Sequence, residues 1–336
     1  MNVLSLFDGM SCGQIALERA EIPVENYFAS EIDKWAIKIT QKNYPNTVQL
    51  GNVSQWQDWH LPKIDLLLGG SPCQGFSIAG KRLDWDDPRS MLFFKYVDCL
   101  KWYKPTWFIF ENVARMKKEV QDAISLELGV EPVRINSSLV SAQNRDRLYW
   151  TNIPNIEQPE DKQIYLKDII EYGYVDKMKS YCIDANYYKG GNPKRYFEKA
   201  SRQLVFDVGI LQRAKGNNLG GIRGYDGKSP SLSSSQWQDN NFLCAFENEL
   251  RDKSKTVRVG GRNSPPGSKQ EWDNIFKSPK DLPKNLKYRK LLPIECERLQ
   301  TVPDNYTKEV SNSQRYKMLG NGWTVDVIVH ILDHIK

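Results

Sequence analysis

The chain lacks any long apolar segment. Hydrophobic residues make up 40% of its 336 residues, enough for a core, yet no stretch approaches the roughly 20 apolar residues that a membrane-spanning helix needs. The first residues, MNVLSLF, contain no basic leader and no cleavage site, so we interpret them as a strand and not as a signal peptide. We therefore expect a cytoplasmic protein with no membrane partner.

The six cysteines lack the spacing of a metal site or a disulfide framework. They are scattered along the chain and form no CxxC pair, which argues against bound zinc. Free thiols at such positions are typical of a reducing compartment. The sequence thus predicts no metal.

Two common nucleotide-binding motifs are also missing. The first glycine loop is not GxGxxG, and no GK[ST] follows, which disfavours a nicotinamide oxidoreductase. Residues 7–13 instead read FDGMSCG, directly after the first predicted strand. Glycines let backbone approach a ligand there, and the helix that follows offers free N–H groups to an anion. A cofactor that carries a carboxylate in place of a pyrophosphate suits this loop.

The net charge of +6 is unevenly distributed. Residues 177–269 contain 17 Lys and Arg against 8 Asp and Glu, a balance of +9, so the rest of the chain sums to −3. Such a basic middle indicates either a polyanion partner such as nucleic acid or an ordinary solvated surface.

Residues 1–154 alternate apolar runs with amphipathic segments, the pattern of an α/β fold with a doubly wound sheet. We expect strands at 2–7, 27–31, 64–69, 107–111, 130–136 and 147–151, and helices that begin near Gly13, Lys34, Ser90 and Glu119. Residues 155–285 are rich in Gly, Asn, Ser, Lys and Arg and predict a smaller, loop-rich domain. Regular structure resumes in 286–336, with helices opening at Pro293 and over 325–335, the latter packed on the N-terminal sheet.

Cys73 is the candidate nucleophile. It lies in SPCQG (71–75), directly after the buried strand predicted at 64–69 and after a proline whose φ is fixed. The mouth of such a sheet is where α/β enzymes place reacting atoms, so an aimed thiol suggests covalent catalysis. The alternative is a small buried hydrophobe.

Two glutamates end predicted strands. Glu31 follows Gly9 by 22 residues, the offset at which a carboxylate accepts hydrogen bonds from ribose hydroxyls; the alternative is a solvated surface glutamate. Glu111 ends an aromatic strand, where desolvation would raise its pKa and let it donate a proton to a ring nitrogen. Its alternative role is a helix N-cap together with Asn112.

The segment QNRDR (143–147) places Gln143, Arg145 and Arg147 on one side of an extended chain. Two guanidiniums there could orient carboxylates or bind phosphate and base oxygens. The alternative is an edge strand protected by charge.

Together and in this order, these features resemble the cytosine-C5 DNA methyltransferases. The resemblance covers residues 1–152 and 287–336, including RKLLPIECERLQ (289–300) and QRYKMLGNGW (314–323), and it favours a prokaryotic or phage type with some features of the animal de novo branch. It implies a Rossmann-like class I methyltransferase with a mostly parallel seven-stranded sheet and a target-recognition domain at 155–285. Two positions depart from the family pattern: the loop 7–13 is one residue longer, and Asn52 stands where an acidic residue is expected.

The resemblance also implies the site. The cofactor would be S-adenosylmethionine and the partner double-stranded DNA, with catalysis by Cys73, Glu111, Arg145 and Arg147. The cofactor-binding residues would be Phe7, Asp8, Gly9, Met10, Cys12, Gly13, Glu31, Ile32, Asn52, Val53, Pro72, Leu92, Asn321 and Trp323. The substrate-binding residues would be Gln74, Ser77, Arg89, Gln143, Arg223 and Arg262. Residues 74–90 resemble a loop that closes over a flipped base.

Three questions stay open at this stage. A related branch methylates transfer RNA, although the basic insertion favours duplex DNA, and the same scaffold could also be a silent DNA-binding module. The enzyme could serve with a cognate restriction endonuclease, alone, or in a phage. The recognised DNA sequence and the oligomeric state are not readable from the chain.

Overall fold

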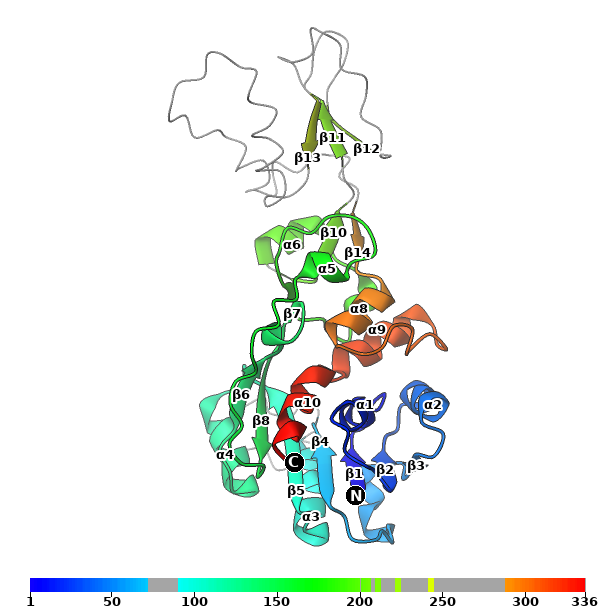
Figure 1. Cartoon of the computed structure of the whole chain (residues 1–336), viewed down its shortest axis with the longest axis vertical. Coiled ribbons are helices and arrows are strands. Elements are labelled where there is room, and N and C mark those ends of the chain that lie inside the picture. Colours follow the sequence, from blue (N-terminus) through cyan, green and yellow to red (C-terminus); the bar gives the residue numbers. More distant parts are fainter. Residues whose placement is uncertain are drawn as a thin grey trace. The chain divides into compact units, whose positions relative to one another are not determined.

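The computed structural model describes residues 1–71, 90–199, 201–206, 209–212, 221–224, 241–244 and 288–335. The chain forms two compact units (Figure 1). The first, here called the sheet unit, comprises Met1–Ile164, Cys182–Tyr188 and Cys296–Lys336. The second unit comprises Tyr165–Tyr181 and Lys189–Glu295. The chain leaves the sheet unit after Ile164 and returns to it over Cys182–Tyr188 and again from Cys296.

The sheet unit is built on seven strands in the order β3-β2-β1-β4-β5-β8-β6. Strands β1 to β5 pair in parallel, whereas β8 pairs antiparallel with both β5 and β6. Their bounds are β1 Asn2–Leu6, β2 Asn26–Ser30, β3 Val48–Gln49, β4 Leu66–Gly69, β5 Trp107–Val113, β6 Val133–Asn136 and β8 Asp146–Thr151. This mostly parallel seven-stranded sheet confirms the predicted fold class.

One face of the sheet is covered by α3 (Ser90–Tyr103) and α4 (Lys118–Leu128). Alternate strand residues such as Leu67, Phe110 and Trp150 point to that face and are fully buried in one core. Phe110 meets Tyr96 and Phe93 of α3 at centroid distances of 4.8 and 5.3 Å, which adds aromatic contact to the packing.

The opposite face is covered by α1 (Cys12–Arg19), against which α10 (Val325–Leu332) packs (Figure 1). A Cβ at Gly13 would meet the Tyr27 hydroxyl at 2.7 Å, so only glycine lets α1 approach the sheet this closely. The helix expected to pack on the N-terminal sheet, α10, lies beside α1 on this face and contacts it (Figure 1).

The remaining elements of this unit are short. They include α2 (Lys34–Asn43), which is N-capped by Asp33, and α9 (Asn312–Asn321). The others are α8 (Pro293–Leu299), β7 (Gln143–Asn144) and the 3-10 turns Val53–Asp58, Ser137–Leu139 and Asp333–Ile335. The helix expected to open at Pro293 does so, and the four predicted helix starts lie within one residue of those observed.

The second unit contains a small buried cluster of Tyr196, Leu204 and Phe206. Fully buried Glu295 accepts two hydrogen bonds from Arg289, at 2.7 and 2.8 Å, and thereby fixes the strand that leads into α8. The elements are α5 Leu166–Ile169, β9 Ser180–Tyr181, α6 Pro193–Lys199, β10 Leu204–Phe206, β11 Gly209–Gln212, β12 Gly221–Gly224, β13 Asn241–Cys244 and β14 Tyr288–Lys290. The 3-10 turn Tyr187–Lys189 begins in the sheet unit and ends at the first residue of the second unit's stretch Lys189–Glu295. Strand β11 pairs antiparallel with β12 and β13, and β10 with β14.

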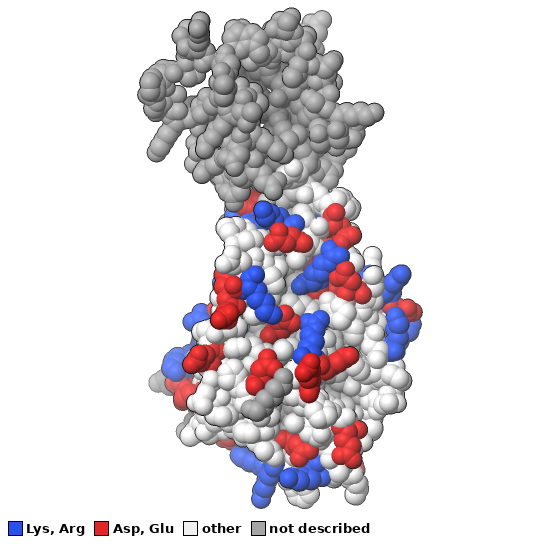
Figure 2. Space-filling view, in the orientation of Figure 1, with Lys and Arg blue, Asp and Glu red and all other residues white. Residues whose placement is uncertain are grey.

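Basic and acidic side chains interleave on the described surface that Figure 2 shows. Most of the basic residues counted in 177–269 lie outside the described residues, so the expected polyanion surface stays a prediction. No helix in the described part of the chain is long and apolar enough to cross a membrane.

Candidate active site

Three strand ends bring two of the predicted catalytic residues, Glu111 and Arg147, to one edge of the sheet together with Gly70. Because β4 and β5 are parallel, Gly70 and Glu111 lie side by side at their carboxyl ends. The antiparallel β8 begins at this edge, so Arg147 pairs in register with Val113 of β5. Sequence positions 70, 111 and 147 therefore meet although about 40 residues separate each from the next.

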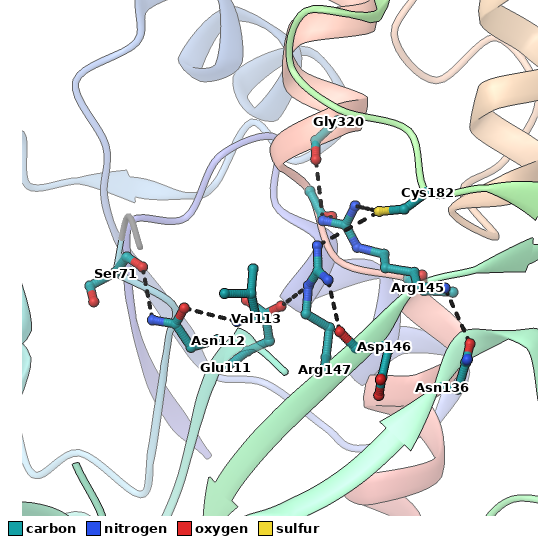
Figure 3. A network of polar contacts seen from close by, with 12 residues as sticks. Ser71, Glu111, Asn112, Val113, Asn136, Arg145, Asp146, Arg147, Cys182 and Gly320 are labelled. Carbon is teal, nitrogen blue, oxygen red and sulfur yellow. Dashed lines mark hydrogen bonds and ion pairs between the residues drawn. The ribbon is translucent and has the colours of Figure 1, made fainter. Parts of the chain in front are cut away.

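Glu111 and Arg147 form a partly buried ion pair (Figure 3). Arg147 Nε lies 2.7 Å from Glu111 Oε1, and the two side chains are only 14% and 13% exposed. Burial opposes the charge of the guanidinium, but Glu111, Cys182 and Tyr149 together raise the pKa of Arg147 above its usual range. The pair fixes the orientation of the Glu111 carboxylate and keeps it from rotating freely.

Gly70 lies against this carboxylate. A Cβ at position 70 would be 3.0 Å from Glu111 Oε2, 3.1 Å from the Glu111 carbonyl oxygen and 3.3 Å from Trp323 Nε1. The next residue is tied to the same strand, since Asn112 Nδ2 donates to the Ser71 carbonyl at 3.3 Å. The backbone that leads to Cys73 thus runs along Glu111 and close to the Trp323 indole.

Arg145 is buried and bonds to the protein itself. Its Nη1 donates to Cys182 Sγ and the Ile183 carbonyl, at 3.3 and 3.2 Å, and its Nη2 donates to the carbonyls of Gly320 and Gly322, at 3.2 and 2.8 Å (Figure 3). Arg147 Nη2 contacts the same sulfur at 3.8 Å, so the two guanidiniums lie on one side of the segment although β7 ends at Asn144 and β8 begins at Asp146 (Figure 3). The ion pair with Glu111 is made by Arg147.

Gln143 is fully buried, and both ends of its amide are used. Its Nε2 donates to Gln300 Oε1 at 2.9 Å and to the Leu299 carbonyl, and its Oε1 accepts from the Ile183 amide at 3.1 Å. Here it faces the protein interior, so its expected contact with the substrate stays a prediction.

The glycine loop is wound in an unusual conformation. Phe7, Gly9 and Ser11 all have positive φ, at 59°, 59° and 63°. Two of these residues carry a Cβ, for which this region is costly, and such strain concentrates at functional sites. Alternating hands of backbone turn consecutive amides in the same direction, the geometry that binds anions.

Asp8 is the titrating group of this loop. It accepts hydrogen bonds from the hydroxyls of Ser11 and Tyr27, the latter at 2.7 Å. Burial, aided by the nearby Glu31 and opposed by these hydrogen bonds, raises the pKa of Asp8 to about 6.

Glu31 joins the loop to the end of β2. Its Oε2 accepts from the Gly9 amide at 2.8 Å, and its Oε1 accepts from the amides of Ile32 and Asp33 at 2.7 and 2.8 Å. Ile32, which follows, is 74% exposed although it is apolar. A carboxylate with an exposed apolar side chain beside it suits a nucleoside, whose ribose is polar and whose base has an apolar face.

Three other predicted cofactor-binding residues differ in their burial and hydrogen bonding. Asn52 accepts a hydrogen bond from the Ser54 amide at 2.9 Å and so caps a 3-10 turn, which uses the oxygen expected to face adenine. Val53 is only 4% exposed and belongs to the main core. Leu92 is partly buried on the edge of that core, in α3.

The C-terminal segment comes back to the glycine loop. A Cβ at Gly322 would be 3.1 Å from Met10 Cε and 3.2 Å from Cys12 Sγ. The Trp323 amide bonds to Cys12, whose thiol pKa burial raises to about 12. Tyr306 reaches the same loop, where its hydroxyl donates to the Met10 carbonyl at 2.8 Å. Asn321 is exposed.

For several predicted site residues the structure gives no side-chain position. Pro72, Cys73, Gln74, Ser77, Arg89 and Arg262 lie outside the described residues, and Arg223 is described only as backbone in β12. Sequence reasoning did not single out Cys182 or Gln300. No sequence pattern around Cys182 indicates a role at the site, whereas Gln300 lies in the RKLLPIECERLQ segment that carries the resemblance.

In the described part of the chain, no cluster of three or more His, Cys, Asp or Glu side chains could hold a metal ion. The four cysteines that the structure describes with their side chains, Cys12, Cys99, Cys182 and Cys296, form no disulfide with one another.

Known proteins resemble the chain along its whole length. The family model of the C-5 cytosine-specific DNA methylases matches residues 1–336. The orphan methyltransferase M.SPRI of Bacillus phage SPR is 27% identical, covering 100% of this chain and 97% of its own length. The type II methyltransferase M.NlaX of Neisseria lactamica is 27% identical over 99% and 96%.

Solved structures share the fold. A mutant of Spodoptera frugiperda DNMT2 superposes with a TM-score of 0.57 at 18% identity, covering 99% of both chains. The S. pombe Dnmt2 methyltransferase gives a TM-score of 0.58 at 15% identity, covering 99% of this chain and 97% of its own. With the match over all 336 residues, the chain belongs to the C-5 cytosine-specific DNA methylase family.

Proposed function

We propose that this enzyme transfers a methyl group from S-adenosylmethionine to C5 of a cytosine flipped out of a specific duplex DNA sequence, through a transient bond between Cys73 and C6. The observation that supports this most is the Glu111–Arg147 ion pair held against Gly70, three residues before Cys73. Such a pair offers a fixed carboxyl and a guanidinium to the edge of a pyrimidine.

The described residues fit the cofactor. Glu31 would hold the ribose, exposed Ile32 the adenine face, and the loop amides after Gly9 the methionine carboxylate. Trp323 and Asn321 would close the pocket from the C-terminal segment. When bound, the cofactor supplies an electrophilic methyl group on a sulfonium. Because the oxygen of Asn52 caps a turn, we expect a weaker contact with the adenine amino group than a free carboxylate would make.

Cytosine C5 is a weak nucleophile, and Cys73 would change that. Its thiolate forms a bond to C6, and the electron pair of the C5=C6 double bond gives C5 enamine character. Glu111, if protonated, would donate to N3, and Arg147 would contact the O2 side, so that both stabilise the charge that develops on the ring. Once C5 is methylated, a base takes the C5 proton, which restores the C5=C6 double bond and expels the Cys73 thiolate.

This chemistry needs a base outside the helix. C6 and C5 are stacked in a duplex, so the target must be extruded before Cys73 can reach it. The basic excess of residues 177–269 would supply phosphate contacts, which make binding salt-dependent. Arg223 and Arg262 are our candidates for reading guanine edges.

The activity is tested with cofactor carrying a labelled methyl group, offered with duplex DNA or with transfer RNA. We expect label in DNA and none in transfer RNA; label in transfer RNA alone would instead support the RNA-modifying alternative. Label in neither would support a silent DNA-binding module. Glu111→Gln should lose most of the rate with little loss of DNA binding, and an unchanged rate would remove Glu111 from the mechanism. Bisulfite sequencing of DNA from expressing cells would identify the target.

The names of the relatives include both an orphan phage enzyme and type II enzymes. We infer a role in DNA modification for this chain, with a cognate restriction endonuclease as one partner. Survival of expressing cells after introduction of an endonuclease that cuts the same site only when it is unmethylated would test that role.

A further inference from the structure

One backbone oxygen next to the proposed cofactor pocket receives two buried side chains. The Gly322 carbonyl accepts from Arg145 Nη2 at 2.8 Å and from Gln300 Nε2 at 2.9 Å. Gly322 precedes Trp323 and packs on Met10 and Cys12 of the glycine loop. The placement of Trp323 is therefore linked to two parts of the chain far away in sequence.

Gln300 uses every hydrogen-bonding position of its amide. Nε2 donates to the carbonyls of Leu319 and Gly322, at 2.6 and 2.9 Å. Oε1 accepts from Gln143 Nε2 and from Thr324 Oγ1, both at 2.9 Å. An amide has two N–H donors and two acceptor lone pairs, so this side chain is saturated, and it is fully buried.

These bonds replace those that a helix end lacks. The last carbonyls of a helix have no partner within it, and α9 ends at Asn321. Gln300 takes the Leu319 carbonyl, and Arg145 takes that of Gly320. Residues 319–324, which link α9 to α10, are thus held by side chains from outside both helices.

The same network reaches the catalytic strand. Gln143 and Arg145 both bond to the backbone of Ile183, and Arg145 stands two residues before Arg147, which holds Glu111. Cys182 Sγ lies 3.3 Å from Arg145 Nη1 and 3.8 Å from Arg147 Nη2. A shift of residues 319–324 would consequently displace Arg145 and, through it, the start of β8.

We propose that Gln300 is a positioning residue of the methyl-donor site, which holds residues 319–324 so that Trp323 and the glycine loop are set for the cofactor before it binds. Gln300 contacts neither cofactor nor base; it acts through Trp323. A rigid pocket binds more tightly than one that must be ordered on binding. This inference rests on the proposed function, because it takes the pocket beside Trp323 as the cofactor's.

The test measures binding of S-adenosylhomocysteine by calorimetry and of duplex DNA by anisotropy, on the full chain. Gln300→Met removes all four bonds at similar length. We expect the dissociation constant for S-adenosylhomocysteine to rise about tenfold, as the loss of hydrogen bonds of ordinary strength implies. We expect that for DNA to change less than about threefold.

Two further variants keep the result interpretable. Thr324→Val is nearly isosteric and removes only one donor, so it should fold and raise the S-adenosylhomocysteine constant about threefold. Gln203→Met is the control, since Gln203 is equally buried, in the second unit, and its Nε2 donates to the Tyr196 hydroxyl and the Leu204 carbonyl. It should lower the unfolding temperature without weakening S-adenosylhomocysteine binding.

The inference is overturned if Gln300→Met and Thr324→Val bind S-adenosylhomocysteine as the wild type does, or if Gln203→Met weakens that binding as much. A wild-type chain that does not bind S-adenosylhomocysteine would refute the proposed function instead, and the inference with it. Failure of the inference would therefore be seen in the variants, and failure of the proposed function in the wild-type chain.

Discussion

Gly70→Ala should slow the reaction without removing either ligand. The added Cβ would lie 3.0 Å from Glu111 Oε2, 3.1 Å from the Glu111 carbonyl oxygen and 3.3 Å from Trp323 Nε1. Ordinary contact begins at about 3.4 Å, so the carboxylate must move by about 0.4 Å and the carbonyl by about 0.3 Å. The carbonyl belongs to β5, which pairs on both sides, so the backbone at Gly70, just beyond the end of β4, has to move in its place.

The expected cost follows from these displacements. A misplacement of about 1 Å lowers an enzyme's rate about 100-fold, so a shift of a few tenths of an ångström should lower it about tenfold. Overpacking should also cost about 1 kcal/mol of unfolding free energy. The assay is single-turnover methyl transfer to DNA at saturating cofactor, with thermal unfolding measured alongside.

The matched control is Gly129→Ala at the end of α4. Gly129 has φ of +72° and no atom within 4 Å of its would-be Cβ, so alanine costs about 1 kcal/mol through backbone strain alone. Its rate should equal that of the wild type. A Gly70→Ala enzyme that is as fast as the control would refute the placement of Glu111 and Gly70 in one site.

Three other changes test separate parts of the site. Arg147→Lys keeps the charge but loses the planar fork that holds Glu111, so methyl transfer should fall at least about tenfold in single-turnover assays, while an unchanged rate would contradict the pairing. The pKa of Asp8 is 3.8 in the unfolded chain and about 6 in the folded one, so the folded state holds the proton more tightly. As the pH rises from 4 to 7, the unfolding free energy of the wild type should therefore fall by up to about 3 kcal/mol relative to that of Asp8→Asn. The same pH dependence of the unfolding free energy in both proteins would contradict this. Gly320→Ala would place a Cβ 2.2 Å from the Asp184 carbonyl carbon, a backbone clash that should cost more than about 3 kcal/mol in chemical denaturation, and wild-type stability would disprove this packing.

The strands and helices near the sheet could be predicted because burial leaves a periodic trace. Strand β4, buried on both faces, is a continuous run of apolar residues, and β5 alternates between two cores. The end of β5 was expected at Glu111, but the strand continues to Val113, because β8 pairs with it as far as Arg147. The sequence of β5 alone does not reveal that β8 pairs with it.

The candidate site was predicted to the extent that strand ends determine it. Glu31, Glu111 and Arg147 follow from the rule that side chains at strand ends share an edge. Arg145 was expected beside Arg147, and both contact Cys182 Sγ, but Arg145 also donates to the carbonyls of Gly320 and Gly322, 175 and 177 residues away. Saturation of buried donors by such distant carbonyls depends on tertiary packing and leaves no mark in the local sequence.

The most direct measurement is covalent trapping on DNA that carries 5-fluorocytosine at the target position, in the presence of S-adenosylmethionine. Fluorine cannot leave C5 as a proton does, so the wild-type chain should stay bonded to DNA through a denaturing gel. Cys73→Ala should give no such band while it still binds the DNA. A band of equal strength from Cys73→Ala would contradict the assignment of Cys73 as the nucleophile.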